Sequence, residues 1–236
     1  MRKLANQADF WKIETDEDHQ DFYEHRGSPP FAVTTKAVPL VVIIKENGDE
    51  SSKAHAVLCD IYHHAIMDEF SKAEGLLVAS HLQEEVQNMD KSTKLLLYRV
   101  VAQLGLCAFR NGLIEEAYSL LCQLYENGRV EEQELLARGF SLSQFHEDTS
   151  EQTILEFLEV VYLICAMLVE DPDTGSLNIS VRKSGENLNL SRIMVASRAF
   201  SEGLYHKSFK IIESLGIWKC LESRVPVLGM LKTKMK

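Results

Sequence analysis

The sequence predicts an all-α fold, a right-handed solenoid of stacked antiparallel helix hairpins. Over most of the chain, apolar residues recur at the i, i+3, i+4, i+7 spacing of one helix face. Only 12 glycines and 5 prolines interrupt the 236 residues, which is sparse for a sandwich or barrel that turns every ten residues or so. Pairs of such helices also recur along the chain, and a short turn joins the two helices of each pair.

The N-terminal segment differs from the rest of the chain. Residues 1–34 are acidic and end in Ser28-Pro29-Pro30, which predicts a mobile arm or linker. Residues 35–236 are predicted to form one helical-repeat domain. Its first apolar run, Lys36 to Lys45, would suit a short strand or a helix, and a helix is favoured because the segments after it are helical.

The first hairpin is predicted from two helical patterns, Lys53–Phe70 and Lys72–Val86. Between them, Ser71-Lys72-Ala73-Glu74 has the form of a capping box, in which a serine accepts from a backbone N–H and a glutamate reaches back. The second hairpin follows, with helices Leu95–Arg110 and Ile114–Tyr125. Asn111-Gly112 supplies the left-handed break between these two helices.

A single long helix separates the second hairpin from the third. Ile154–Val169 is apolar almost all round, which is typical of a helix covered on both sides. The polar stretch 171–190 after it predicts a long mobile loop. The helices Ile193–Ser201 and Leu204–Leu215 then form the third hairpin around Gly203.

The three turns carry a degenerate repeat. Phe109 lies 44 residues after Ala65 and 91 residues before Phe200, and a small residue follows each turn at the same spacing. Small residues at this point let the two helices of a hairpin approach closely. Helix pairs with a period of about 45 residues indicate a tetratricopeptide-like solenoid. The residues of the predicted repeat packing are Ala65, Ala73, Phe109, Gly112, Ala117, Phe200, Gly203 and Ser208.

Charge is distributed unevenly along the chain. The formal net charge is −10, which argues against a global cationic surface for nucleic acid or anionic membrane. The C-terminal 31 residues are nevertheless basic, with seven lysines and arginines against two glutamates. These cations could meet an acidic partner or a phosphate backbone, or they could be the solvated face of an amphipathic final helix. The candidate contact residues are Lys207, Lys210, Lys219, Arg224 and Lys232.

The cysteines and the apolar runs indicate the cellular compartment of the protein. The five cysteines are odd in number and widely spaced, and no C-x-x-C occurs, which favours reduced, buried thiols. The N-terminus lacks the apolar core of a secretory signal, and the longest apolar run, Val160 to Val169, is too short to cross a bilayer. These features predict a cytoplasmic protein that makes no membrane contact.

The sequence contains one candidate site for metal binding or catalysis. Cys59 and His63 are four residues apart, as are Asp60 and His64, so two pairs of potential metal ligands lie on adjacent helix faces. A metal-dependent enzyme at Cys59, His63 and His64 is one alternative, and ordinary helix packing is the favoured one because no further ligands follow at recognisable spacing. No Walker loop, G-x-G-x-x-G, G-x-S-x-G or H-E-x-x-H motif occurs, and no cofactor is expected.

Several longer stretches resemble a known family. They are Leu58–Ala65, Ser80–Gln83, Leu97–Arg99, Val101–Leu113 and Glu134–Gly139. In order and spacing they are similar to the C subunits of eukaryotic translation initiation factor 3. The resemblance is dense between Ala56 and Gly139, and it is weaker but collinear over Leu158–Glu170 and Val195–Lys236.

The resemblance implies a PCI-type subunit, in which helical repeats lead into a winged helix, and which acts as a scaffold rather than a catalyst. The implied partners are sister PCI subunits, other initiation factors and the small ribosomal subunit, reached through the full-length protein. The family's long N-terminal region is expected to be missing from this chain, and the winged helix is expected to begin beyond residue 236. The predicted function is assembly of initiation complexes through protein–protein contacts. The alternatives are a ribosomal-RNA-contacting module at the basic C-terminal helix and the metal-dependent enzyme described above.

Overall fold

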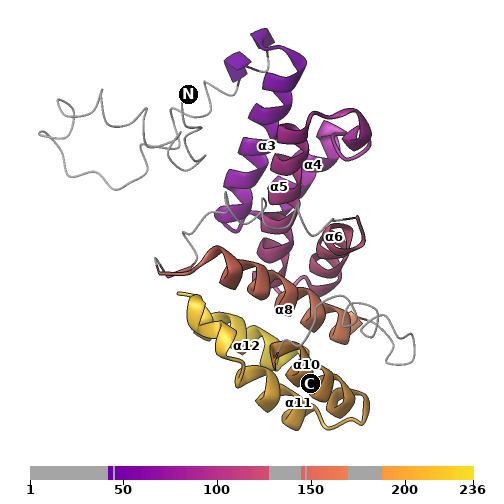
Figure 1. Ribbon diagram of the computed structural model, residues 1–236, viewed down its shortest axis with the longest axis vertical. Helices are drawn as coiled ribbons and strands as arrows, with labels where there is room; N and C mark the ends of the chain where they lie inside the picture. The colour runs from indigo at the N-terminus through magenta and orange to yellow at the C-terminus, as the bar shows by residue number, and fades with distance from the viewer. Residues whose placement is uncertain (1–41, 45, 128–144, 147, 170–187) are drawn as a thin grey trace, which may run out of the picture.

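The computed structural model describes residues 42–44, 46–127, 145–146, 148–169 and 188–236, and within them it confirms an all-α fold (Figure 1). An isolated antiparallel bridge joins Phe145 to Leu221, and no strand is present in the described ranges. The helices are α3 (Glu50–Ile66), α4 (Phe70–Ser80), α5 (Lys91–Arg110), α6 (Ile114–Asn127), α8 (Glu151–Val169), α10 (Leu188–Ser201), α11 (Tyr205–Glu213) and α12 (Arg224–Lys234), with short 3-10 turns η2 (Val86–Asn88) and η4 (Gly216–Cys220).

Some predicted segments lie wholly or partly outside the described residues. The arm 1–34 and residues 171–187 of the polar stretch are outside them, as is the matching stretch Glu134–Gly139. Residues 188–190, placed in a loop by the sequence, already belong to α10. Of the run from Lys36 to Lys45, residues 42–44 are described, and they are helical.

Several helices begin earlier than the apolar pattern predicted, and at two of them, α3 and α5, an aspartate caps the helix. The Asp49 carboxylate accepts from the Ser52 backbone N–H at 2.7 Å, and α3 starts at once after it. Asp90 accepts from the backbone N–H groups of Ser92 and Thr93 at 3.0 and 3.2 Å, so α5 begins before its first buried apolar residue. Side chains at this position satisfy N–H groups that have no partner within the helix.

The predicted capping box at Ser71–Glu74 is wrong. These residues lie inside α4, whose N-cap is Glu69, and Glu69 makes no side-chain cap bond. The chain turns earlier, at Asp68, which has φ +60°. A short aspartate tolerates this left-handed conformation better than most residues, so the turn closes before Phe70, which is buried in α4.

The three hairpins share one backbone turn. We call residues 67–69 turn 1, residues 111–113 turn 2 and residues 202–204 turn 3. The central residue is left-handed each time, with φ +60° at Asp68, +74° at Gly112 and +76° at Gly203. The next residue donates its N–H to the carbonyl five residues earlier, at 3.0, 2.9 and 2.8 Å respectively, which is a Schellman-type helix end. The predicted spacings of 44 and 91 residues therefore coincide with one repeated turn.

The hairpins close through small residues. A Cβ placed on Gly105 of α5 would lie 2.9 Å from Cγ of Leu121 on α6, so these helices are in close contact at that point. Ala117 of α6, one helical turn before Leu121, is fully buried. In the third hairpin the corresponding residue is Ser208, whose buried hydroxyl donates to the Ala196 carbonyl on α10 at 2.8 Å. The hydroxyl is thereby satisfied inside the core.

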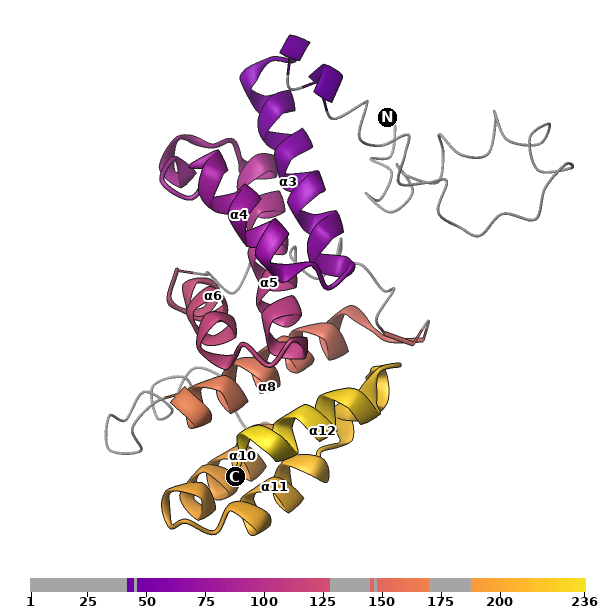
Figure 2. The same ribbon diagram turned by 180° about the vertical axis from the view of Figure 1, so that it is seen from behind.

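The helices up to α11 follow one another along the long axis, and α12 returns toward α8, as Figures 1 and 2 show. The hairpin α3–α4 forms one end, α5 packs on α3 and α6, and α6 packs on α8. The hairpin α10–α11 and helix α12 lie on the other side of α8 and form the opposite end. Adjacent helices therefore bury their apolar faces against one another, as in an α-helical repeat.

Helix α8 is the central core helix. By length and composition its 19 residues would be enough to cross a membrane, although the run Val160–Val169 alone is too short. In the fold, however, 61% of its apolar window is buried, because α6 covers one side and α10 another. Tyr162 of α8 stacks on Tyr125 of α6 with ring centroids 4.6 Å apart. Burial, together with the nearby Glu159 charge, raises the pKa of Tyr125.

An aromatic cluster attaches the C-terminal part to α8. Trp218 in η4 meets Phe157 edge-on, and Phe157 meets Phe145 in the same way. The Trp218 indole N–H donates to the Ile212 carbonyl at 2.7 Å, so its polar group is satisfied although the ring is buried. Helix α12 follows and reaches turn 2, where Met230 lies against Gly112.

Candidate partner-binding surface

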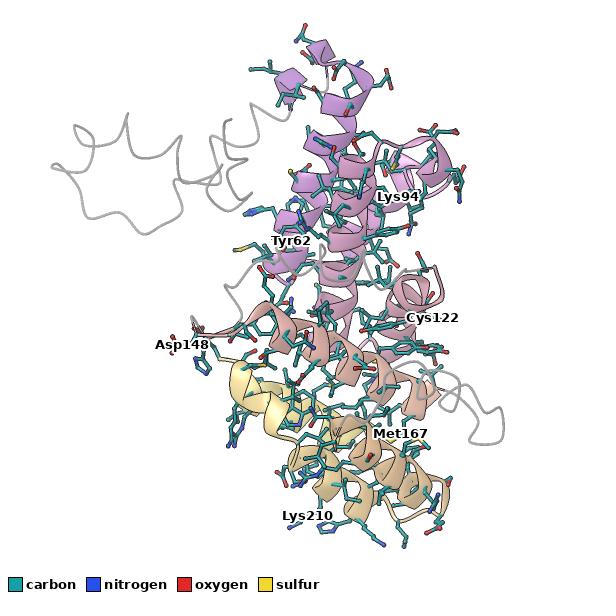
Figure 3. All side chains as sticks on the ribbon, in the orientation of Figure 1. Tyr62, Lys94, Cys122, Asp148, Met167 and Lys210 are labelled. Carbon is teal, nitrogen blue, oxygen red and sulfur yellow. The ribbon has the colours of Figure 1, made fainter. Side chains whose placement is uncertain are left out.

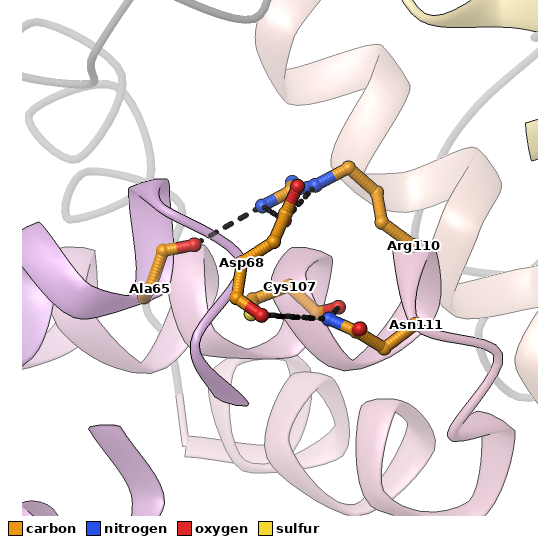
Figure 4. Close-up of polar contacts among 5 residues, drawn as sticks. All are labelled: Ala65, Asp68, Cys107, Arg110 and Asn111. Atoms are coloured by element: carbon orange, nitrogen blue, oxygen red, sulfur yellow. Dashed lines mark hydrogen bonds and ion pairs between the residues drawn. The ribbon is translucent and has the colours of Figure 1, made fainter. Parts of the chain in front are cut away.

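A polar cluster joins the first hairpin to the second at turn 1 (Figure 4). Arg110, at the end of α5, donates through Nε to Asp68 Oδ1 at 2.7 Å, and its Nη2 lies 2.7 Å from the same oxygen. The Arg110 Nη2 group also donates to the Ala65 carbonyl at 3.1 Å. Asn111 adds a bond from Nδ2 to the Asp68 carbonyl at 3.3 Å. These bonds attach the end of α5 to the α3–α4 turn and fix how the two hairpins stack.

The sequence missed this cluster, although a signal for it exists. Asp68 lies 44 residues before Gly112, so it occupies the left-handed position of the repeat. Aspartate is one of the few residues that tolerate that position. The partner Arg110 could not be identified by spacing alone, because its contact spans 42 residues and depends on how α5 packs on α3.

The stretch from Cys59 to His64 lies on α3, and its spacing is helical as predicted. His64 binds carboxylates on both sides: Nδ1 is 2.6 Å from Glu69 Oε2, and Nε2 is 3.6 Å from Asp60 Oδ1. It therefore connects the end of α3 to the start of α4. Burial, and then the neighbouring His64, lowers the pKa of His63.

Cys59, His63 and His64, the proposed metal ligands, lie on one helix. Among the residues that the structure describes, no group of three or more histidine, cysteine, aspartate or glutamate side chains is arranged to hold a metal ion. None of the five cysteines is in a disulfide. Burial raises the pKa of Cys107 and of Cys220 to about 11, so these two thiols are protonated at neutral pH.

The predicted cationic residues all lie on the surface of the C-terminal end. Lys207 and Lys210 are on α11, Lys219 is in η4, and Arg224 and Lys232 are on α12. Figure 3 labels Lys210 at the end of the molecule farthest from α3. Within the described ranges, no carboxylate forms an ion pair with any of the five.

The described surface is electrically polarised along its long axis. Residues 188–236 contain nine lysines and arginines and three glutamates, and all nine cations are exposed. Acidic residues predominate between 46 and 127, where several cations are already engaged, including Arg110 with Asp68. One end of the molecule therefore offers a positive surface, and the other offers a negative one.

The predicted repeat residues occupy equivalent places in the three hairpins. Gly112 and Gly203 are the left-handed residues of turns 2 and 3. Phe109 is buried, whereas Phe200, its counterpart in the third hairpin, is only half-buried. The remaining four, all fully buried, are Ala65, Ala73, Ala117 and Ser208.

Comparisons with known proteins identify relatives of the chain. Residues 28–180 match a family model described as "Eukaryotic translation initiation factor 3 subunit 8 N-terminus". A protein of Schizosaccharomyces pombe is named as the C subunit of eukaryotic translation initiation factor 3. It is 31% identical to this chain in an alignment 235 residues long, and the alignment covers 84% of this chain and 25% of that protein. Proteins of the same name are 31% identical in Botryotinia fuckeliana (82% of this chain, 26% of the relative) and 41% identical in Bombyx mori (56% and 16%). The chain spans about a quarter of the length of the first two of these curated relatives.

Proposed function

Because the chain belongs to the family of the C subunits of eukaryotic translation initiation factor 3, we propose that it is a non-catalytic scaffold for initiation complexes. In this proposal the outer faces of the stacked hairpins bind other subunits of the factor in the cytoplasm. Other initiation factors and the small ribosomal subunit are further partners, reached through the full-length protein. The assignment of these hairpins to a PCI region stays a prediction.

One observation carries the proposal. Three hairpins with the same turn lie one after another along one axis, and each leaves part of its surface exposed (Figure 2). Helical-repeat proteins use such extended surfaces to bind other proteins. The close approach at Gly105 and the Asp68–Arg110 pair hold successive helices in a fixed relation, which suits a scaffold that positions partners.

Reconstitution tests this proposal. The chain should co-elute on size exclusion with the remaining subunits of the factor, assembled without their own C subunit. Ala117→Trp is the matched control, since it should disrupt the α5–α6 hairpin and lose the interaction. Elution of the wild-type chain alone, at concentrations where the complete factor is intact, would contradict the scaffold role.

A second candidate function is contact with ribosomal RNA through the basic C-terminal end. The nine exposed cations of residues 188–236, several of which lie on α11 and α12, favour it. Phosphate contacts make affinity fall steeply with salt, by about 10³ or more between 50 and 200 mM when several are made. Fluorescence anisotropy with a labelled ribosomal RNA fragment measures this slope. A shallow slope, or equal binding by a Lys207→Glu and Lys210→Glu double variant, would exclude this function.

A further inference from the structure

The three equivalent turns are not equally covered by the rest of the fold. Turn 1 is covered by Arg110 and Asn111, which bond to the side chain and carbonyl of Asp68. Turn 2 is covered by α12: a Cβ on Gly112 would lie 3.3 Å from Cγ of Met230 and 3.4 Å from Cε of Lys234. In both cases a side chain from another helix rests directly on the turn.

Among the described residues, no side chain rests on turn 3 in this way. Apart from the two residues next to Gly203 in the chain, none of them would have a heavy atom within 4 Å of a Cβ on that glycine. Leu204 and Tyr205, next along the chain, are 45% and 43% exposed. At turn 2 the residue equivalent to Tyr205 is Ile114, which is only 8% exposed. Phe70, the equivalent residue after turn 1, is 6% exposed, so the residue that follows the turn is buried in the first two hairpins and exposed in the third.

The surroundings of turn 3 give the open surface its chemistry. Phe200 is half-buried and meets Tyr205 edge-on, with ring centroids 5.2 Å apart. Arg198, in the last turn of α10, and Lys207, in the first turn of α11, are both exposed, and neither has an ion pair within the described ranges. We define the turn-3 patch as Arg198, Phe200, Leu204, Tyr205 and Lys207. The exposed Glu202 lies in the same turn, so two cations face one carboxylate there.

From this comparison we infer that the turn-3 patch is a docking site for an acidic amphipathic helix of a partner protein. The helix takes the place that α12 takes at turn 2, and sets an aliphatic or methionine side chain on Gly203. Its carboxylates pair with Arg198 and Lys207. This inference rests on the scaffold function proposed above and specifies one surface and one kind of partner for it.

Charge decides between the possible occupants. Helix α12 of a second copy has the right shape, but it carries Arg224, Lys232 and Lys234 and would be repelled by the cations of the patch. Nucleic acid would use the cations, but it gives no account of the exposed aliphatic side chain of Leu204 beside an uncovered glycine. An acidic amphipathic helix satisfies both the apolar and the charged part of the patch.

A defined peptide tests the inference. The probe is a dye-labelled synthetic helix of leucine, methionine, alanine and glutamate, with apolar residues at i, i+3, i+4, i+7 and glutamate on both flanks. Its binding to the whole chain is followed by fluorescence anisotropy at physiological salt. We expect Leu204→Glu and Lys207→Glu each to weaken binding about tenfold or more, since the first adds a charge to the apolar contact and the second reverses an attraction.

Matched control variants come from the first hairpin. Lys72 occupies the position equivalent to Lys207, and Val78 is a comparably exposed aliphatic residue on α4. Lys72→Glu and Val78→Glu should bind the peptide as the wild type does. Circular dichroism melts should show that all four variants remain folded, since each changes an exposed side chain.

Other outcomes overturn the inference. It fails if a scrambled peptide, or a peptide with lysine in place of glutamate, binds as tightly as the probe. It fails if the Leu204→Glu and Lys207→Glu variants bind the probe as the wild type does. It also fails if a polyuridylate competitor displaces the peptide from the same patch at physiological salt. It also fails if light scattering shows a wild-type dimer that Leu204→Glu abolishes. Capture of the other subunits by the wild-type chain separates the scaffold function from the docking site at turn 3. If the chain captures the subunits but does not bind the peptide as expected, only the docking site is contradicted. If the chain does not capture the subunits, the scaffold function is contradicted.

Discussion

At the scale of single residues, Gln103 stands apart within the core. It lies on α5 with no exposed surface, and within the described part of the chain neither amide atom has a hydrogen-bond partner. The equivalent residues in the other hairpins are Cys59 and Met194, which are apolar. A buried amide without partners costs about 1–3 kcal/mol of stability.

We therefore expect Gln103→Met to stabilise the fold. Methionine keeps nearly the same volume and removes the unpaired polar atoms, so the free energy of unfolding should rise by about 1–2 kcal/mol. Urea denaturation followed by circular dichroism measures it. Gln123→Met is the control, because Gln123 is exposed and accepts from Gln83, and it should change stability by no more than about 0.5 kcal/mol. A loss of stability in Gln103→Met would mean that the amide has a stabilising partner.

The N-cap of α5 should make stability depend on pH. Hydrogen bonds from Ser92, and then from Thr93, hold the pKa of Asp90 well below its ordinary value. The folded state thus favours the carboxylate, and its contribution is present above the unfolded pKa of about 4 and is lost as the pH falls further.

Two variants at this position separate capping from titration. Asp90→Ser should keep α5 capped at pH 7 but lose part of the fall in melting temperature between pH 5 and pH 2. Asp90→Ala should lower the melting temperature already at pH 7. If the wild type and Asp90→Ser show the same pH profile, the carboxylate does not carry the effect.

At the scale of elements, the hairpins depend on a small residue where the paired helices cross. Ala117 on α6 has no exposed surface, and Gly105 faces Leu121 at a distance that leaves no room for a Cβ. Ala117→Trp should destabilise the fold by about 3 kcal/mol or more, because an indole at this position must separate α5 from α6.

Thermal unfolding tests that expectation against a control on the same helix. Ser119 is exposed on α6, so Ser119→Trp should leave the melting temperature almost unchanged. An unchanged melting temperature in Ala117→Trp would mean that the register of the hairpin is wrong.

The helices themselves were largely predictable, and their ends were less so. Apolar periodicity located α3, α4, α5, α6, α8, α10 and α11, and the repeat spacing located Gly112 and Gly203 at the turns. The helix starts at Glu50 and Lys91 were missed because polar residues follow the capping aspartates, and periodicity does not detect polar first turns. The capping box at Ser71 failed because the turn at Asp68 had already closed the hairpin.

The surface was less predictable than the helices. The sequence identified the cationic tail, and the structure places those lysines and arginines on exposed faces of α11, η4 and α12. It could not identify the Asp68–Arg110 pair or the uncovered turn 3, because both depend on which helix packs over which turn. Such contacts between distant segments are set by tertiary packing rather than by local pattern.

At the scale of the whole molecule, the fold combines a stack of helix hairpins with opposite charge at its two ends. The negative end contains the first two hairpins, and the positive end contains α10, α11 and α12. The net charge of −10 therefore describes neither end, and it excludes a basic interaction surface only for the first two hairpins. A polarised scaffold of this kind can orient unlike partners at opposite ends.

The scaffold account is tested most directly by native mass spectrometry of the tagged chain co-expressed with the remaining subunits of the factor, with and without ribonuclease treatment. If the chain holds its partners by protein–protein contacts, the same subunits should remain bound in equal amounts after ribonuclease, at physiological salt. Loss of those subunits on ribonuclease treatment, or recovery of the chain alone in both samples, would contradict the account.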